Sequence, residues 1–319
     1  MFTNFQNLEY FITTAKEGNI TRAAERMHIS QQALSGSISR LESELGCELF
    51  TRRPSFGLTY AGKCFLKTAT EILDLKEQGE TMLADINGEG KGELKLGISH
   101  TRGQAILPTV LPEFNRLYPK VDLTITESST KVLEDMLDKG LIDVLVGFMP
   151  IMVDGVVAQP LVRDRLMLVL PKTLLKEHFG DNAEKVCEEY RKTRDLRLFK
   201  DMPFVLLRES ERIRTHVNRA FASHHIRPQI KTETYNIQTA YSLAAEGMGA
   251  AVCPEMYLKS HYTVPGVASK DEVVTLPFFA DDVYDTIGIG FNSNRYLSRI
   301  AQDFIEICTR KTKSLDIEV

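Results

Sequence analysis

The sequence predicts an α/β fold with an all-α N-terminal part. Three features predict it: short helical patterns before residue 60, a proline-free helical pattern over residues 61–87, and alternating strand and helix patterns after Gly92. We therefore expect a winged helix-turn-helix over residues 1–60, a linker helix and hinge over 61–91, and a two-lobed α/β domain over 92–319.

The N-terminal segment shows three short helical patterns. The first carries an apolar stripe and ends near Gly18, and Thr21 has a side chain suited to cap a second helix that runs to about Met27. Ser30 follows a short turn and is a good cap for a third helix that runs to about Leu45. The stripe of the first helix comprises Leu8, Phe11, Ile12 and Ala15. Three closely joined helices of this kind predict a helix-turn-helix.

The predicted third helix has an apolar face and a small polar face. At about 100° per residue, the apolar side carries Leu34, Ile38, Leu41 and Leu45. The opposite side has no charge and consists of Gln32, Ser35, Gly36, Ser39 and Ser43. Small polar side chains let a helix approach base edges closely, and glutamine can make a bidentate contact with adenine. A solvated helix face is the alternative, although such faces usually carry Lys and Glu.

A short β-hairpin, or wing, is predicted after this helix. Segments 48–51 and 57–59 flank a loop with Arg52 and Arg53 near its tip, where arginines would suit phosphates or the minor groove. Two arginines in a loop are common in proteins of any function. We assign them a DNA-contacting role because they follow a predicted helix-turn-helix. The DNA-contact residues that we expect are Thr21, Ser30, Gln31, Gln32, Ser35, Gly36, Ser39, Arg52 and Arg53.

The pattern over residues 61–87 predicts one long helix with a seam for pairing. Its apolar positions follow the 4-3 spacing of a dimerising helix. Lys76 and Gly79 interrupt the middle, and a glycine inside a helix costs roughly 1 kcal/mol, so we expect pairing that is not strong by itself. The seam comprises Phe65, Ala69, Ile72, Lys76, Gly79, Leu83 and Ile86. A glycine-rich linker over residues 87–92 follows.

Alternating patterns after Gly92 predict two α/β lobes. Strands over 94–99, 121–127 and 143–148 alternate with helices over 105–118 and 131–139, which predicts a parallel sheet with right-handed crossovers. The remaining elements are strands near 166–170, 204–207, 230–233, 250–253 and 286–291, with helices over 212–224, 237–246 and 296–311. We expect lobe I to comprise about 92–161 and 265–319, and lobe II about 162–264. Segment 171–202 adds polar helices over 173–178 and 182–191 to which we assign no role.

Composition excludes several classes of protein. The net charge of −4 and pI of about 6.0 argue against a protein that coats nucleic acid by charge alone. A small DNA-binding module remains possible, because residues 1–66 carry seven Lys/Arg against six Asp/Glu while the remainder carries 32 against 37. The five cysteines form no C-x-x-C pair, so we expect no disulfide framework, no metal site and a reducing cytosol. Residues 1–12 lack the charge and apolar pattern of a signal peptide, and no apolar run could span a membrane, so we expect a cytoplasmic protein without membrane contact.

The predicted DNA-binding part resembles the signature of LysR-type transcriptional regulators. The matching segments are AAERMHISQQALS from Ala23 to Ser35, LESELG from Leu41 to Gly46, LFTR at 49–52 and LTYAG at 58–62. They keep the family's order and near-family spacing, which is far more specific than a generic helix-turn-helix. Further matches in the second half are Gly97-x-Ser99 before Leu107-Pro108, Phe114 before Tyr118-Pro119, Asp143 before Gly147, and Gly247-x-Gly249 before Pro254. The resemblance covers essentially the whole chain.

The resemblance implies a DNA-binding regulator controlled by a small co-inducer. It implies a homodimer or tetramer, a recognition helix in the major groove of a promoter inverted repeat, contact with RNA polymerase, and a periplasmic-binding-protein-like effector domain. Two positions and one segment depart from the family, and the segment, residues 171–202, is longer than usual. Gly36 stands where the family often has Arg, which could remove a phosphate or base contact, and Gln32 replaces a frequent Pro.

The same resemblance puts Ser99 and its neighbours at the effector site. Ligands of α/β sheets bind beyond the carboxyl ends of strands, where helix N-termini and hydroxyl groups converge. The effector-contact residues that we expect are Ser99, His100, Thr101, Ser129, Thr130, Phe148, Arg208, Glu209, Ser210 and Gln238. Helix N-termini and Arg208 favour a small anionic or polar metabolite. Helix capping is the alternative for each hydroxyl, and a surface ion pair is the alternative for Arg208.

Three other functions fit part of the sequence. A periplasmic solute-binding protein would fit the two lobes but not the helical N-terminus. An enzyme is not indicated, because P-loop, dinucleotide-binding, H-E-x-x-H, G-x-S-x-G and zinc patterns are all missing from the sequence, so we assign no catalytic residue and no cofactor. An architectural DNA binder would leave the α/β lobes without a purpose.

Overall fold

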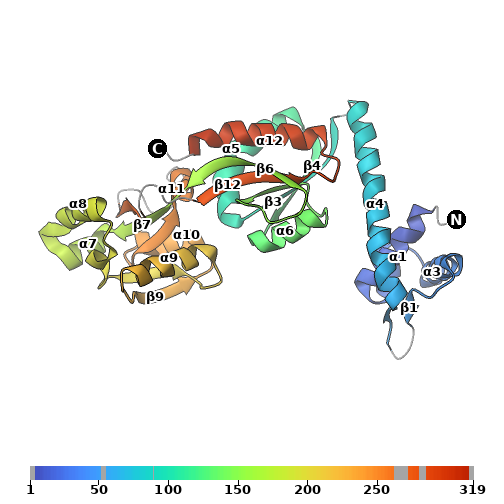
Figure 1. Ribbon diagram of the computed structural model, residues 1–319, viewed down its shortest axis with the longest axis horizontal. Coiled ribbons are helices and arrows are strands. Elements are labelled where there is room, and N and C mark those ends of the chain that lie inside the picture. Colours follow the sequence, from blue (N-terminus) through green and yellow to red (C-terminus); the bar gives the residue numbers. More distant parts are fainter. Residues whose placement is uncertain (1–3, 52–54, 89, 262–271, 280–284, 316–319) are drawn as a thin grey trace. The chain divides into compact units, whose positions relative to one another are not determined.

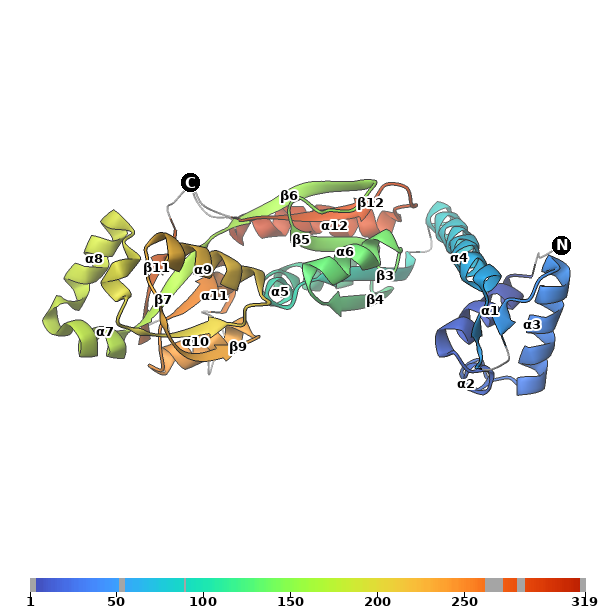
Figure 2. The same cartoon turned by 60° about the horizontal axis from the view of Figure 1, so that its bottom comes forward.

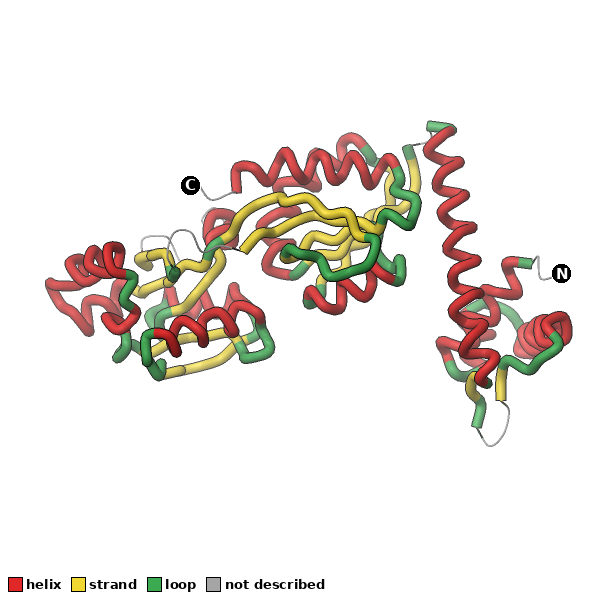
Figure 3. Tube along the Cα trace, in the orientation of Figure 1, coloured by secondary structure: helices red, strands yellow, loops and turns green. Residues whose placement is uncertain are grey.

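The chain divides into two units, residues 1–89 and 90–319. The computed structural model describes residues 4–51, 55–88, 90–261, 272–279 and 285–315. Within them, the first unit consists of helices with one short hairpin, whereas the second mixes helices and strands (Figures 1 and 3).

Three helices form the core of the first unit as the sequence predicts: α1 (Phe5–Glu17), α2 (Ile20–Arg26) and α3 (Gln31–Leu45). Ser30 caps α3 by accepting a hydrogen bond from the Ala33 N–H. The prediction that Thr21 caps α2 is wrong. The Asn19 side chain accepts from the N–H groups of Thr21 and Arg22, so the helix starts at Ile20. Asn19 can do this because Gly18, at φ +57°, has already turned the chain out of α1.

Two side chains, those of Glu42 and Thr59, tie the wing to the helices that flank it. Strand β1 (Phe50–Thr51) pairs antiparallel with β2 (Gly57–Leu58). The Glu42 carboxylate accepts hydrogen bonds from the N–H groups of Leu49, at 2.8 Å, and Phe50, at 3.1 Å. Thr59 donates to the backbone oxygens of Glu48 and Leu49 and caps the helix that follows by accepting from the Gly62 N–H.

The long helix α4 (Tyr60–Ile86) uses part of its apolar seam within its own unit. Ala69 is fully buried, and Phe65 and Ile72 pack against the same core as Phe11. Toward the end of the helix, Leu83 is 62% and Ile86 73% exposed. The first half of the predicted seam is therefore occupied by α1 and its neighbours, and the second half is open.

Lobe I of the second unit is built on a five-stranded sheet with the order β4-β3-β5-β12-β6. Its elements in chain order are β3 (Lys91–Ile98), α5 (His100–Leu117), β4 (Lys120–Glu127), α6 (Thr130–Asp138), β5 (Val144–Phe148), β6 (Val156–Asp164), β12 (Asp285–Asn292), α12 (Arg299–Lys311) and η4 (Thr312–Leu315). Strands β3, β4 and β5 are parallel as the sequence predicts, and β12 runs antiparallel to β5 and β6. Helices α5 and α12 cover one face of the sheet and α6 the other (Figures 1 and 2).

Two elements of lobe I differ from the sequence-based expectation. Strand β6 was not predicted, because Pro160 interrupts its pattern, but a proline is tolerated on the edge of a sheet, where β6 lies. Helix α5 begins at His100 rather than near residue 105, and this places Arg102 and Gly103 in its first turn.

Lobe II contains two smaller sheets. Strands β10 (Ala251–Pro254) and β11 (Val273–Pro277) both pair antiparallel with β7 (Leu166–Pro171), and β8 (Pro203–Leu207) pairs parallel with β9 (Gln229–Thr234). Helices α9 (Arg212–Ser223), α10 (Ile237–Ala245) and α11 (Glu255–His261) complete the lobe. The expected return to lobe I near residue 265 is wrong, since β11 still belongs to lobe II and the chain re-enters the lobe I sheet with β12. The pairing of β11 depends on a distant strand, so local patterning did not reveal it.

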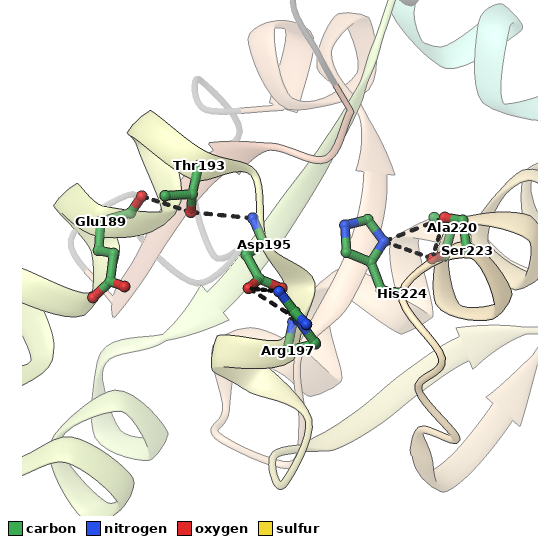
Figure 4. Close-up of polar contacts among 7 residues, drawn as sticks. All are labelled: Glu189, Thr193, Asp195, Arg197, Ala220, Ser223 and His224. Atoms are coloured by element: carbon green, nitrogen blue, oxygen red, sulfur yellow. Dashed lines mark hydrogen bonds and ion pairs between the residues drawn. The ribbon is translucent and has the colours of Figure 1, made fainter.

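The unassigned segment 171–202 forms an extension of lobe II. It comprises α7 (Lys172–Phe179), η1 (Gly180–Asn182), α8 (Ala183–Thr193) and η2 (Leu196–Phe199). Leu174, Tyr190 and Phe199 are buried in the lobe II core, so these helices are amphipathic rather than polar. Asp195 fixes the turn after α8 by binding the guanidinium group and the N–H of Arg197 (Figure 4). The same guanidinium lowers the pKa of the Asp195 carboxyl.

Gly62 is required where α4 meets the wing, because a Cβ atom there would lie 2.1 Å from the Leu49 backbone oxygen. We expect Gly62→Ala to lower the free energy of unfolding of the full chain by roughly 1–3 kcal/mol. Gly79→Ala in the same helix is the matched control: no heavy atom lies within 4 Å of its Cβ, and alanine favours helix by up to about 1 kcal/mol. Urea denaturation measures both. Equal effects of the two substitutions would contradict the steric argument.

Candidate DNA-contacting helix and effector cavity

The small polar face of α3 is open to solvent. Gln31, Gln32 and Gly36 are exposed, and a Cβ atom at Gly36 would meet nothing within 4 Å. Ser39 is also exposed and Ser35 half-buried. Leu34, Ile38 and Leu41 on the opposite face are buried, as the helical spacing predicts, while Leu45 is only partly buried.

Two expected DNA-contact residues meet at the start of α3. Thr21 Oγ1, at the start of α2, lies 3.4 Å from Gln31 Oε1 as a hydrogen-bond donor. Arg52 and Arg53, expected at the tip of the wing, lie outside the described residues. Sequence reasoning missed Arg40, which is exposed one helical turn after Gly36, and helical periodicity would have found it.

A cavity of about 700 Å³ lies between the two lobes. It is lined by the turns that follow β3 and β4, by the end of β5, and by the start of α9 in lobe II. Of the residues that we expected at an effector site, those that line the cavity are Ser99, His100, Thr101, Ser129, Thr130, Phe148 and Ser210.

Arg208, Glu209 and Gln238 were also expected at this site, but they are not among the residues that line it. The Arg208 guanidinium lies over the ring of Tyr235, 4.5 Å from its centroid, and donates to the Tyr235 hydroxyl. The Arg208 N–H bonds to the Thr234 oxygen, which extends the pairing of β8 with β9 by one residue. After Leu207, the next residue of this turn that lines the cavity is Ser210. Gln238 accepts a hydrogen bond from Gln104 at 3.3 Å and thereby joins the two lobes.

Two arginines that sequence reasoning missed lie over the ring of Phe148. The guanidinium carbon of Arg102, from α5, is 3.7 Å from the ring centroid, and that of Arg212, from α9, is 3.8 Å from it. Arg212 Nη2 also lies 3.2 Å from Asp285 Oδ1 in lobe I. Arg212 therefore links lobe II to two residues of lobe I.

Arg102 is buried, with 8% of its surface exposed. Its Nη1 donates to Ser99 Oγ at 2.8 Å, and burial lowers the pKa of the guanidinium to about 10. Arg102 follows His100 and Thr101 in the first turn of α5, at a position where the helix faces inward. The inward-facing stripe of Ala105 and Ile106 would have revealed it had the helix been predicted to start at His100.

A buried carboxylate also lines the cavity. Asp164 ends β6 and is 6% exposed, and its Oδ1 accepts a hydrogen bond from the Met256 N–H at 3.0 Å. Burial raises the pKa of Asp164 from 3.8 to about 6, although the Met256 N–H and Arg102 oppose this rise. The next residue, Arg165, pairs with Glu255 at 2.6 Å where the chain passes from β6 to β7.

His100 and Glu127 form a second charged contact at the cavity, with 2.9 Å between Nδ1 and Oε2. The Gln104 amide nitrogen lies 3.1 Å from His100 Nε2. His100 is thus held in one orientation between α5 and β4.

Over the described ranges, no group of three or more His, Cys, Asp or Glu side chains could hold a metal ion. Among the same residues, no helix is long and apolar enough to cross a membrane.

Comparisons with known proteins match both units. The model of the bacterial regulatory helix-turn-helix protein of the lysR family matches residues 5–63, and that of the LysR substrate binding domain matches residues 87–313. The HTH-type transcriptional regulator YcgK of Bacillus subtilis is 29% identical over 316 residues, which cover 96% of this chain and 94% of the relative. The nitrogen assimilation regulatory protein nac of Klebsiella aerogenes is 30% identical over 259 residues, 81% of this chain and 80% of the relative.

A solved structure shows the same fold. Full-length CbnR in complex with its target DNA is 23% identical, with a TM-score of 0.62 over 97% of this chain and 100% of CbnR.

The raised pKa of Asp164 makes stability depend on pH. Below about pH 4 the carboxyl is protonated in both states, whereas between about pH 4 and 6 only the unfolded state releases its proton, so stability falls as pH rises through this window. Asp164→Asn keeps an acceptor for the Met256 N–H without the charge. We expect its stability advantage over the parent protein to grow by roughly 2–3 kcal/mol between about pH 4 and pH 7.5. Urea denaturation of the full chain at both pH values measures this growth. The exposed Asp181→Asn is the control, and an advantage of Asp164→Asn that stays constant with pH would refute the assignment.

Proposed function

Because the chain belongs to the family of LysR-type transcriptional regulators, we propose that a small effector in the cavity between its lobes controls how it binds promoter DNA. The protein is a DNA-binding transcriptional regulator with a helix-turn-helix domain and an effector-binding domain. The family consists of regulators rather than enzymes, and for this cavity we propose binding without a catalytic reaction. The observation that carries the proposal is the cavity of about 700 Å³ with charged side chains in its lining.

On the DNA side, we propose that α3 enters the major groove with its small polar face. Gln31, Gln32, Ser35 and Ser39 lie on the open side of the helix, and the missing side chain at Gly36 allows a close approach to bases. The proposed contacts also include Thr21 and Ser30 at the starts of α2 and α3, and Arg52 and Arg53, which would contact phosphates or the minor groove. Arg40 is placed to supply the positive charge that Gly36 does not.

We propose that two copies pair through the open second half of α4. Leu75, Leu83 and Ile86 are 68%, 62% and 73% exposed, and burial of such side chains against a second copy is favourable. A two-fold dimer calls for an inverted repeat in the promoter, with half-sites spaced by helical turns. Further assembly to a tetramer, contact with RNA polymerase and a cytoplasmic location complete the proposal.

The effector would act through contacts that already cross between the lobes. Arg212 of lobe II touches Phe148 and Asp285 of lobe I, and Gln104 of lobe I bonds to Gln238 of lobe II. A ligand that binds one arrangement of the lobes more tightly than another shifts the population toward it. We propose that its acidic group binds at Arg102 and the N-terminus of α5, where positive charge is concentrated.

Base-reading residues are tested by sequence preference. We expect Gln32→Ala and Ser35→Ala each to reduce the free-energy preference for the target duplex over a random duplex by roughly 1–3 kcal/mol. The reason is that a lost base contact weakens only binding to the target. Fluorescence anisotropy with the promoter site, identified by genomic footprinting, measures both affinities. Parent protein that binds both duplexes equally at low and moderate salt would end the DNA-reading proposal.

Phosphate-contacting residues are tested by salt dependence. We expect Arg52→Ala and Arg53→Ala to weaken binding to target and random duplexes alike, and to reduce the slope of log affinity against log salt by about 1 each. Lys16→Ala, which removes an exposed charge at the end of α1, is the matched control and should change neither quantity. The same footprint and salt slope for the arginine and Gln32 variants would refute the division of roles.

A further inference from the structure

The charged residues that line the cavity differ in burial and in pairing, and two of them are accessible to solvent: Lys131 is exposed and Glu211 half-buried. Two basic side chains already contact an acid: His100 contacts Glu127 at 2.9 Å, and Arg212 contacts Asp285 at 3.2 Å. Arg102 and Asp164 are different, because both are more than nine-tenths buried and yet form no ion pair with each other. These two side chains define what a ligand must supply.

The Arg102 guanidinium has spare donors. Its Nη1 donates to Ser99 Oγ, and no other described residue accepts a hydrogen bond from it. Nε is buried without any partner in the described part of the chain, and Nη2 has no described acceptor. A buried cation that keeps unpaired donors is costly, and a carboxylate that reaches the guanidinium removes that cost.

Asp164 has a spare acceptor. Its Oδ1 is bonded to the Met256 N–H, whereas no described residue donates to Oδ2. A ligand that carries only negative charge would satisfy Arg102 but would add a second anion close to this carboxylate. A ligand that carries only positive charge would satisfy Asp164 and repel Arg102. Asp164 therefore disfavours a ligand that is only an anion, and Arg102 disfavours a ligand that is only a cation.

We propose that the effector is a small zwitterion of the amino-acid type, with its carboxylate at Arg102 and the start of α5 and its ammonium group at Asp164. This inference rests on the proposed function, because it names the ligand of the same cavity. The ammonium group supplies three donors, of which Asp164 Oδ2 takes one. Two guanidinium groups cover Phe148, so the apolar side chains that remain for the rest of the ligand include Leu207, Ile213 and Ile237 of the lining.

Matched ligand sets test this inference. Isothermal titration calorimetry on the full-length protein uses the common α-amino acids, together with β-alanine and 4-aminobutyrate to vary the charge spacing. Each α-amino acid is compared with the 2-oxo acid and the amine that share its side chain. We expect at least one zwitterion to bind, and its 2-oxo acid and amine to bind at least roughly tenfold more weakly, since each lacks one charged hydrogen bond.

Two substitutions assign the groups of the ligand. Asp164→Asn should weaken binding of the zwitterion by roughly 10- to 100-fold and strengthen binding of the 2-oxo acid. The preference for the zwitterion over the 2-oxo acid should therefore shrink or reverse. Arg102→Gln should weaken both ligands that carry a carboxylate and spare the amine. Asp181→Asn and Arg219→Gln, both exposed in lobe II, are the charge-matched controls and should leave all three affinities unchanged.

Three results would overturn the inference. They are equal binding of an amino acid and its 2-oxo acid, a preference that Asp164→Asn leaves intact, and no binding of any zwitterion by protein that still recognises its promoter. In the last case the regulator function stands and only the ligand class fails. If the parent protein did not recognise promoter DNA, that result would instead overturn the proposed function.

Discussion

The burial of the Arg102 guanidinium against Phe148 is the constraint on which the chemistry of the cavity depends. Burial removes much of the water around this charge, and the Ser99 hydroxyl, the aromatic ring and the field of Asp164 offset only part of the lost hydration. The Arg102 guanidinium also holds the hydroxyl of Ser99, which lines the cavity. A second guanidinium, that of Arg212 in lobe II, lies over the same ring. The Phe148 ring therefore joins the buried charge of Arg102 to a contact between the two lobes.

Local patterns in the sequence predicted most helices and the parallel strands, because helical spacing, caps and apolar runs depend on near neighbours. Ser30 and the apolar face of α3 are examples. Pairing between distant segments carries no such signal. Strand β11 and the true end of lobe II depend on β7, more than a hundred residues earlier along the chain. Seven expected effector residues line the cavity, whereas Arg102 and Asp164 went unseen, because a charge inside an apolar helix or strand pattern looks like a surface residue.

The segments of the first unit that match the family signature combine exposed polar residues with structural ones. Glu42, Thr59 and Gly62 do not lie on the open face of α3. They hold the wing against the helices through backbone hydrogen bonds and a close approach that excludes even a methyl group. Gln32 and Gly36, the positions where we expect a departure from the family, lie on the open face. The residues that hold the wing and the residues on the open face of α3 are therefore separate sets.

The distribution of thiols separates the two units chemically. Cys187, Cys253 and Cys308 in the second unit are buried, and burial raises the pKa of each, which suppresses the reactive thiolate. Cys47 and Cys64 in the first unit are exposed. A maleimide dye would thus attach to the helix-turn-helix and its neighbouring helix while sparing the sensor lobes. The native sequence already provides an optical reporter of DNA-domain motion, without the need to remove or introduce a cysteine.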